Sequence, residues 1–422
     1  MKSLALRNVT VIDCTGKPAM LGMTVVIVGN RIESLNPVGK TTNAAGVQVV
    51  DASGKFLIPG LWDMHVHWWP GENGSGLSPL FIPNGVTGVR TMGGGRDQSQ
   101  AFIKLRGEIA EGKSLGPRLI VASQTLNSLR PLLDQEAGPE DVRVAVKDGA
   151  DLIKVYSGLS RKAYFDIVEE ARKLGIPFGG HVPQPEVSLE EASNAGQTSI
   201  EHIYHLRGFI RQRMGSDEVG VSGLNDSDRA ALFKLFETLR KNGTWSCPTH
   251  IAQQGNGPIL RADPRLKYFP AAVKDAWARK GASGTPASPE RMQRIRNAEH
   301  ELTGAMHKAG VGILAGSDAA PGVAMPGFML HDELQRLVTA GLSPMDALRT
   351  ATYNPAEFLG LLDSLGTVAP GKLAELVLLD ANPLDDIANT TKINAVFTGG
   401  RMYPKKALDA ILSAVEANAA RN

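Results

Sequence analysis

Two histidines separated by one residue, His65 and His67, end the apolar run FLIPGLWDMHVH. In a β-strand, residues i and i+2 point to the same side, so both imidazoles could face one ion. Imidazole is a preferred ligand of zinc and of neighbouring transition metals. Because a His-x-His pair also occurs by chance, further ligands are needed before the motif predicts a metal site.

Further candidate ligands end other apolar runs that read as strands. His181 ends IPFGGHV, His202 lies in TSIEHIYH, and Asp318 ends VGILAGSD. Each falls at the C-terminal end of its predicted strand, where the catalytic groups of TIM barrels collect. Structural packing alone does not explain so many imidazole and carboxylate groups at strand ends. With the His-x-His pair, they predict a metal centre.

A lysine in an apolar strand, Lys154 in ADLIKVYS, is the least expected residue of the series. Lysine is rarely buried without a charged partner, and burial lowers the pKa of its ammonium group. The neutral amine is nucleophilic and can react with carbon dioxide to form a carbamate, an oxygen ligand for metals. The alternative interpretation is a lysine paired with a nearby carboxylate.

Weaker candidates for catalysis and substrate binding lie beside these residues. Tyr156 is two residues after Lys154, and Tyr204 is two after His202, so each shares the side of its neighbour and could contact substrate. Packing or surface positions are the alternative for all of these candidates. The others are His205 and Arg207 as readers of an anionic substrate, His250 as an oxyanion stabiliser, and Asp63 as a residue that orients a ligand.

The elements that must position these residues have the pattern of a (β/α)8 TIM barrel. Between about residues 56 and 360, eight apolar strand-like runs alternate with amphipathic segments such as 161–175 and 228–243. Eight strands alternating with helices is the count of an α/β barrel of this type. Two longer connections, about 208–227 and 253–290, are predicted to be lids or binding loops.

The two ends of the chain have a different pattern. Residues 1–55 and 366–406 contain short β-branched runs punctuated by Gly, Asn and Pro. We predict one small β-sandwich built from both ends. The expected domains are therefore residues 1–55, the barrel over 56–360, and the rest of the sandwich with a C-terminal helix over 361–422.

Composition and charge exclude several classes of function. The 422 residues carry a net charge of +2, with no basic stripe interleaved with aromatics, so nucleic acid is not an expected partner. No apolar run reaches the roughly eighteen residues of a membrane span, and no signal peptide is recognisable. We expect a cytoplasmic protein. Cys14 and Cys247, the two cysteines, do not make a disulfide framework.

The motifs PGLWDMHVH, DLIKVYS, GGHVP, SIEHI and GSDAAP, in this order, resemble those of the amidohydrolase superfamily. The chain is similar to its imidazolonepropionase-like and prolidase-like branch, which includes Xaa-Pro dipeptidases, arginine or lysine carboxypeptidases and ochratoxin-type amidases. The resemblance covers nearly the whole chain and is specific for the superfamily, not for the substrate. Superfamily members commonly form symmetric homo-oligomers, so we expect one here.

The resemblance implies a set of metal ligands. His65, His67 and Asp318 would hold the more buried of two divalent ions. His181 and His202 would hold the second ion. Zinc is the expected metal, because sites of imidazole and carboxylate suit it.

The resemblance also implies that carbamylated Lys154 bridges the two ions. Two ions about 3.5–4 Å apart lower the pKa of a shared water, so that a bridging hydroxide is available near neutral pH. Asp318 would take its proton and deliver it to the leaving nitrogen. We expect hydrolysis of an amide bond of a small molecule, such as a peptidyl or N-acyl amino acid.

Two alternatives remain open. Imidazolonepropionases are also similar, but they use one metal and no bridging lysine, so a mononuclear hydrolase of a cyclic amide, or a deaminase, would leave Lys154 structural. A non-catalytic metal-binding barrel is the alternative from another class. The number of bound metal ions and the presence of a lysine carbamate distinguish the one-metal enzyme from the two-metal hydrolase. Metal-dependent turnover of any amide would exclude the non-catalytic barrel.

Overall fold

The structure is a computed structural model of the whole chain. Much of the predicted connection 253–290 lies outside the residues that it describes. The described residues are 3–39, 47–68, 75–127, 136–253, 263–271, 274–275, 288–319 and 325–421.

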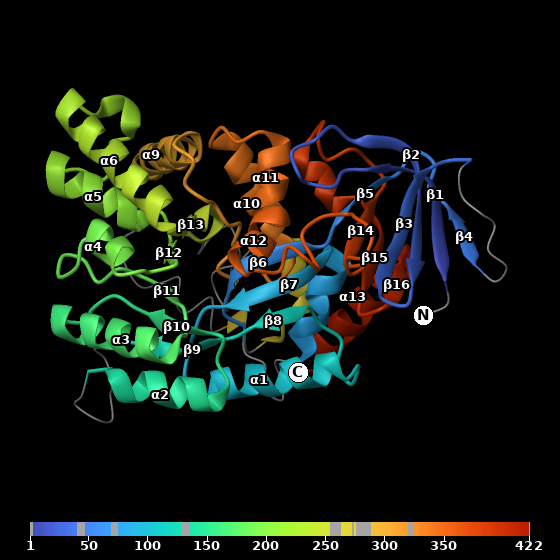
Figure 1. Cartoon of the computed structure of the whole chain (residues 1–422), viewed down its shortest axis with the longest axis horizontal. Coiled ribbons are helices and arrows are strands. Elements are labelled where there is room, and N and C mark those ends of the chain that lie inside the picture. Colours follow the sequence, from blue (N-terminus) through green and yellow to red (C-terminus); the bar gives the residue numbers. More distant parts are fainter. Residues whose placement is uncertain are drawn as a thin grey trace.

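Strands from both ends of the chain form one mixed eight-stranded sheet, at the right of Figure 1. Strand β1 pairs with β2 on one side and, on the other, first with β4 and then with β5. Hydrogen bonds join all eight strands into a single sheet, and its packing as a sandwich stays a prediction. The strands are β1 (Leu4–Val11), β2 (Met20–Val28), β3 (Arg31–Pro37), β4 (Gln48–Asp51), β5 (Phe56–Pro59), β14 (Leu376–Leu379), β15 (Ile393–Thr398) and β16 (Arg401–Pro404).

The strands in the middle of the chain form two parallel sheets. One has the order β6-β7-β8 and the other the order β13-β12-β11-β10-β9. Strands β8 and β9 are separated only by Val121, so one extended segment pairs with β7 in its first part and with β10 in its second. The strands are β6 (Leu61–Val66), β7 (Val86–Thr91), β8 (Arg118–Ile120), β9 (Ala122–Leu126), β10 (Leu152–Val155), β11 (Phe178–Gly180), β12 (Ser199–Glu201) and β13 (Trp245–Cys247).

The predicted eighth strand, residues 311–318, is not a regular strand but lies between these two sheets. Ile313 forms a parallel bridge with Ser246 of β13, and Ala319 forms one with Val66 of β6. The Met64 N–H of β6 also donates to the Ala315 carbonyl at 2.9 Å. The segment 312–319 therefore hydrogen-bonds to both parallel sheets.

Helices lie between most of these strands, as the periodicity predicted. Helix α3 begins after Ser160, whose hydroxyl accepts from the Ala163 N–H, and ends at Leu174, just before Gly175 with its positive φ of 66°. The helices are α1 (Arg96–Ala110), α2 (Pro139–Asp148), α3 (Arg161–Leu174), α4 (Leu189–Asn194), α5 (Tyr204–Met214), α6 (Asp226–Asn242), α9 (Pro289–Lys308), α10 (Phe328–Thr339), α11 (Pro344–Thr350), α12 (Tyr353–Phe358) and α13 (Lys405–Ala419). Short 3-10 helices are η1 (Ser75–Asn84), η2 (Val221–Gly223), η3 (His250–Gln253), η4 (Pro264–Tyr268) and η5 (Ile387–Thr391).

Two of these helices test the predicted pattern directly. The amphipathic segments 161–175 and 228–243 are confirmed as α3 and α6. The predicted connection 208–227 is wrong in its first part, because α5 continues to Met214. Leu206 and Ile210 are buried at helical spacing and hold this segment against the core, whereas its Gly- and charge-rich composition suggested a loop.

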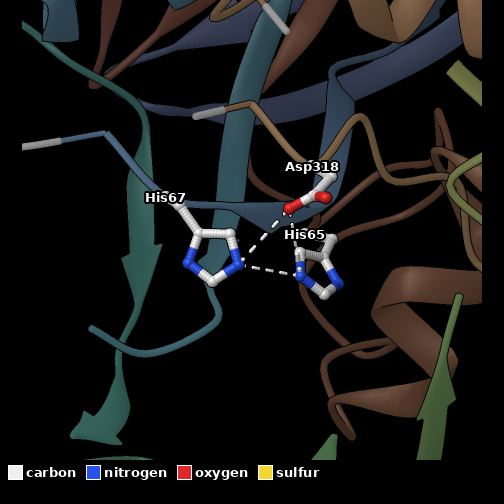
Figure 2. Close-up of side chains that lie close together, drawn as sticks. All are labelled: His65, His67 and Asp318. Carbon is white, nitrogen blue, oxygen red and sulfur yellow. Dashed lines mark hydrogen bonds and ion pairs between the residues drawn. The ribbon is translucent and has the colours of Figure 1, made fainter. Parts of the chain in front are cut away.

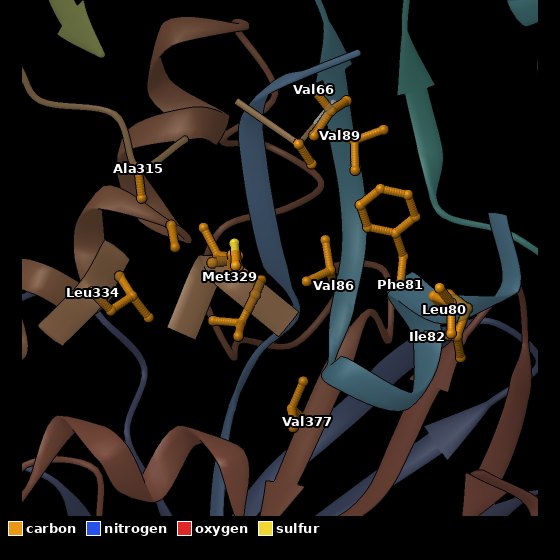
Figure 3. Close-up of a cluster of buried hydrophobic side chains, with 14 of the residues drawn as sticks. Val66, Leu80, Phe81, Ile82, Val86, Val89, Ala315, Met329, Leu334 and Val377 are labelled. Carbon is orange, nitrogen blue, oxygen red and sulfur yellow. The ribbon is translucent and has the colours of Figure 1, made fainter. Parts of the chain in front are cut away.

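A large apolar cluster packs the parallel strands against α10 and against the sheet of the chain ends (Figure 3). Val86 and Val89 of β7 contribute to it, as do Leu334 of α10 and Val377 of β14. These side chains are fully buried. The same cluster therefore fixes the strand that carries the His-x-His motif, since Val66 also belongs to it.

In the part of the chain that the structure describes, every helix is too short or too polar to cross a membrane.

We predict that the buried His331 makes stability depend on pH. Its imidazole lies between the Thr390 hydroxyl and the Asn84 carbonyl, at 2.9 and 3.0 Å, and burial lowers its pKa from 6.5 to about 4, with Asp332 and Arg265 as nearby charges. Between these pH values the unfolded chain binds more protons, so this contribution to stability is lost as pH falls from 6.5 towards 4.

The measurement is the free energy of unfolding in urea at pH 7 and pH 5. His331→Gln should reduce the loss of stability between the two pH values. His307→Gln, at the end of α9, controls for the removal of any histidine. An unchanged pH dependence in the His331 variant would contradict the prediction.

Candidate metal centre

Three predicted ligands from two distant segments of the chain lie together, as Figure 2 shows. The Nε2 atoms of His65 and His67 are 3.0 Å apart, and Asp318 Oδ1 is 3.5 and 3.4 Å from them. In a tetrahedral zinc site with metal–ligand distances of about 2.0–2.1 Å, neighbouring ligand atoms are about 3.3–3.4 Å apart. The three atoms therefore have nearly the separation that one divalent ion requires.

The hydrogen bonds of the two histidines leave lone pairs facing each other. His65 Nδ1 is 2.7 Å from Glu201 Oε2, and His67 Nδ1 is 3.4 Å from the Gly93 carbonyl oxygen. A carboxylate and a carbonyl oxygen only accept, so each neutral imidazole carries its hydrogen on Nδ1 and a lone pair on Nε2. Burial lowers the pKa of His67 to about 4, and that of His65 well below its usual value. Two such lone pairs at 3.0 Å repel each other, and a bound cation relieves this repulsion, so the donor set fits a metal ion.

The hydrogen bonds of His202 also leave the lone pair of its Nε2 free to bind a metal ion. Its Nδ1 is 2.7 Å from the Thr249 hydroxyl oxygen, and that hydroxyl donates to the Pro248 carbonyl at 2.8 Å. Because the hydroxyl hydrogen is already committed, Thr249 accepts from Nδ1–H, and the Nε2 lone pair is free. The His202 ring lies 4.7 Å from that of His65, between centroids.

His181 completes the group of four imidazoles. Its ring centroid is 4.8 Å from that of His202. Its Nδ1 is 2.8 Å from the Tyr204 hydroxyl and 3.0 Å from the Ser157 hydroxyl, either of which can accept its hydrogen. Tyr156 stacks on the same ring, with centroids 4.0 Å apart. Tyr204 therefore orients an imidazole, whereas the half-exposed Tyr156 lies on its outer face.

Lys154 is fully buried beside the histidines. Its Nζ has no hydrogen-bond partner among the residues that the structure describes, and no described carboxylate forms an ion pair with it. Burial lowers its pKa to about 8, although Glu201 and Asp318 act in the opposite direction. The carboxylate-paired alternative is therefore not what the described residues form. Gly93 and Gly180 make room for the side chain, since a Cβ on either would lie 3.0 Å from a Lys154 carbon.

The backbone around the ligands is held by Asp63, which the sequence suggested as an orienting residue. Its carboxylate accepts from the Ser317 N–H at 2.9 Å, from the Ser317 hydroxyl at 2.5 Å and from the His65 N–H at 3.3 Å. It thus ties β6 to the segment that carries Asp318, instead of contacting an imidazole ring. Asp318 and His202 both have positive φ, 53° and 67°, which is uncommon for residues other than glycine and often marks functional sites.

Sequence reasoning missed two charged residues of the site, Glu201 and Arg90. Glu201 is the acceptor for His65, and Arg90 donates to Glu201 Oε1 at 2.7 Å. Both are fully buried. The signal was present, because a charged residue within an apolar strand run, GVRT or SIEH, is as unexpected as the lysine in DLIKV.

Three predicted site residues, His250, Arg207 and His205, contact side chains of the protein outside the proposed ligands. His250 Nε2 lies 3.0 Å from the Thr303 hydroxyl, so this ring faces α9. Arg207 forms ion pairs with Asp217 at 3.2 Å and with Glu299 at 2.9 Å.

These contacts occupy the guanidinium of Arg207, and its role as a reader of an anionic substrate stays a prediction. His205 lies behind His181, with ring centroids 5.3 Å apart, and its Nδ1 contacts Gln184 at 3.2 Å. Burial lowers its pKa to about 3, so the imidazole is neutral near neutral pH, and its contact with a substrate stays a prediction.

The known proteins that are similar to this chain have names that indicate different activities. An adenine deaminase of Rubrobacter xylanophilus is 23% identical over 435 residues, which is 97% of this chain and 61% of that protein. The chain spans about 60% of the length of such curated deaminases. Among solved structures, a bottromycin amidohydrolase has a TM-score of 0.73 at 23% identity, covering 99% of this chain and 90% of its own. A Xaa-Pro dipeptidase has a TM-score of 0.69 at 22% identity, covering 95% of this chain and 100% of its own.

The structural similarity shows a TIM-barrel-type α/β fold, and the sequence similarity does not single out one branch of relatives. The family model matches residues 56–403, which include all the strands that carry the histidines, Lys154 and Asp318. Since this match covers well over half of the chain, the chain belongs to the Amidohydrolase family.

Proposed function

We propose that this protein is a metal-dependent hydrolase that cleaves a carbon–nitrogen bond of an amide, in a peptidyl or N-acyl amino acid. The observation that carries the proposal is the triangle of His65 Nε2, His67 Nε2 and Asp318 Oδ1, with edges of 3.0, 3.4 and 3.5 Å. Neutral imidazoles with bare Nε2 atoms and an adjacent carboxylate are a donor set for zinc. The names of two structural neighbours, a prolidase of Bifidobacterium longum and a Xaa-Pro dipeptidase, support an amide substrate.

The proposal divides the ligands into two sets that share one lysine. The first set is the triangle, and the second is His181 with His202, whose rings are 4.8 Å apart. Divalent ions bound there would lower the pKa of a water and polarise the scissile carbonyl. The buried Lys154 amine would attack carbon dioxide: a nitrogen–carbon bond forms, the π bond of one C=O opens onto its oxygen, and one proton of the amine is released to solvent. The resulting carbamate would offer its oxygens as ligands to divalent ions.

Asp318 is the residue proposed to move the proton. It lies at the edge of the histidine group, and its side chain is 18% exposed, so it can reach both the site and a substrate. It would accept the proton of the attacking water and deliver it to the leaving nitrogen. Tyr156, half-exposed on the outer face of His181, would donate from its hydroxyl to an oxygen of the substrate.

We also infer that the parallel strands close into a barrel. The segment 312–319 bonds to β13 on one side and to β6 on the other. The continuous segment of β8 and β9 connects the remaining edges of the two sheets. In such a barrel the ligands would all face the end at which the strands finish.

Deamination is the second candidate, because the curated relatives include adenine deaminases. Hydrolysis of an amidine releases ammonia, whereas hydrolysis of a peptidyl or N-acyl amino acid releases an amino acid. Screening zinc-loaded protein against dipeptides, N-acyl amino acids and adenine derivatives, with detection of both products, distinguishes the two. A protein that turns over none of them, with or without metal, would favour the non-catalytic barrel.

We predict that turnover depends on metal and on Asp318. Removing metal with a chelator should abolish amide hydrolysis, and zinc should restore it. Asp318→Asn should reduce kcat by at least about a hundredfold, the usual range for a lost acid–base group, while most metal is kept. Metal analysis and steady-state kinetics check both outcomes. Full activity in the Asn variant would contradict the proton-transfer role.

Lys154→Met should separate the two-metal hydrolase from its one-metal alternative. Methionine fills the buried space without an amine, so no carbamate can form. We expect the zinc content to fall from two ions per chain towards one, with loss of turnover. A variant with unchanged metal content and activity would show that Lys154 is only structural.

A further inference from the structure

A chain of buried polar groups connects three strands beneath the proposed metal site. It runs from Arg90 on β7 through Glu201 on β12 to His65 on β6. All three side chains are fully buried. Strands β7 and β12 belong to different parallel sheets, so the chain of contacts crosses the interior between them.

Arg90 uses each of its three nitrogens to hold this arrangement. Its Nε donates to the Met64 carbonyl at 2.7 Å, Nη1 to the Ser199 hydroxyl at 2.9 Å, and Nη2 to Glu201 Oε1 at 2.7 Å. The Ser199 hydroxyl in turn donates to Glu201 Oε1 at 2.5 Å. The carboxylate thus has one oxygen fixed by two donors, and its other oxygen, Oε2, is left for His65. The planar guanidinium with several donors suits this role, and a lysine would not replace it.

We propose that Glu201 is a positioning residue for the metal ligand His65, and that Arg90 and Ser199 hold Glu201 in place. The inference rests on the proposed metal site. A carboxylate that accepts from the far nitrogen of a metal-bound histidine fixes its tautomer and ring orientation and makes it a stronger ligand. Glu201 would thereby keep the hydrogen of His65 on Nδ1 and the lone pair of Nε2 directed at Asp318 and His67.

The cost of burying these charges supports a functional role. A buried ion pair is often no more stabilising than apolar residues of the same size, so stability alone gives little reason for Arg90 and Glu201. The same carboxylate also precedes His202, whose positive φ of 67° changes the direction of the chain directly after β12. One fixed strand end therefore carries both the acceptor for His65 and a second proposed ligand.

The test is zinc affinity, measured by competition with a chromogenic chelator, which does not depend on activity. Glu201→Gln keeps the shape but can direct an amide N–H at His65 Nδ1, which would disfavour the required tautomer. We expect its affinity at the tighter site to fall about 10–100-fold. Glu375→Gln, a largely buried glutamate next to β14, is the matched control and should keep wild-type affinity.

A double-mutant cycle tests the role of Arg90. Arg90→Met alone leaves the buried Glu201 charge unpaired and should weaken both folding and zinc binding. If Arg90 acts through Glu201, adding Arg90→Met to Glu201→Gln should weaken zinc binding little further, so that the two effects are not additive. Circular dichroism and urea unfolding of the metal-free proteins report separately on the fold.

Should Glu201→Gln not fold, Glu201→Asp replaces it in the test. The aspartate keeps the charge opposite Arg90 but is one carbon shorter, so it cannot contact both partners as closely, and its zinc affinity should also fall. Zinc affinity within twofold of wild type in either folded variant would overturn the inference. If the wild-type protein itself binds no zinc, the proposed function fails instead, and the two failures are thereby distinguishable.

Discussion

The proposed site depends on the direction of four imidazole rings. Each ring has an oxygen atom within hydrogen-bonding distance of its Nδ1: a carboxylate for His65, a backbone carbonyl for His67, and hydroxyl groups for His181 and His202. Because burial lowers the pKa of all four, they are neutral and have one lone pair each. Fixing the hydrogen on the outer nitrogen directs that lone pair inwards, which prepares the site for a cation.

Keeping these polar groups inside the protein requires a rigid surrounding structure. Asp63 ties β6 to the segment 312–319, and Arg90 ties β7 to β12. Each contact joins segments that are far apart in the sequence. The apolar cluster shared by β7, α10 and β14 holds the same strands from outside. A shift of any one strand would therefore move a ligand, and the metal-binding geometry is a property of the whole set of strands.

The known proteins similar to this chain carry names of different activities, among them an adenine deaminase and a Xaa-Pro dipeptidase. Such diversity is common for barrels, because the residues at the strand ends can be kept while the surrounding contacts change. In this chain, Arg207 illustrates the point. Its position after β12 suggested contact with an anionic substrate, yet it pairs with Asp217 and Glu299. The contacts of such a residue are therefore set by tertiary structure.

The sequence alone was sufficient to identify the candidate ligands. The period-2 spacing of His65 and His67, the polar residues at strand ends and the apolar run around Lys154 are local patterns, and local patterns are readable without coordinates. The alternation of strands and helices likewise predicted α3 and α6. These features depend on neighbours in the chain, and their physical causes are backbone geometry and burial.

Only the tertiary structure decided which groups meet. The contact between His65 and Glu201 spans 136 residues, and that between Asp63 and Ser317 spans 254. Nothing in the local sequence specifies such pairs, because they arise when strands from distant parts of the chain are placed side by side. For the same reason, the local sequence TWSCPTH, which ends at His250, could not predict that the imidazole ring faces α9. The sequence supplies the chemical groups, and packing determines the hydrogen-bond partners that orient them.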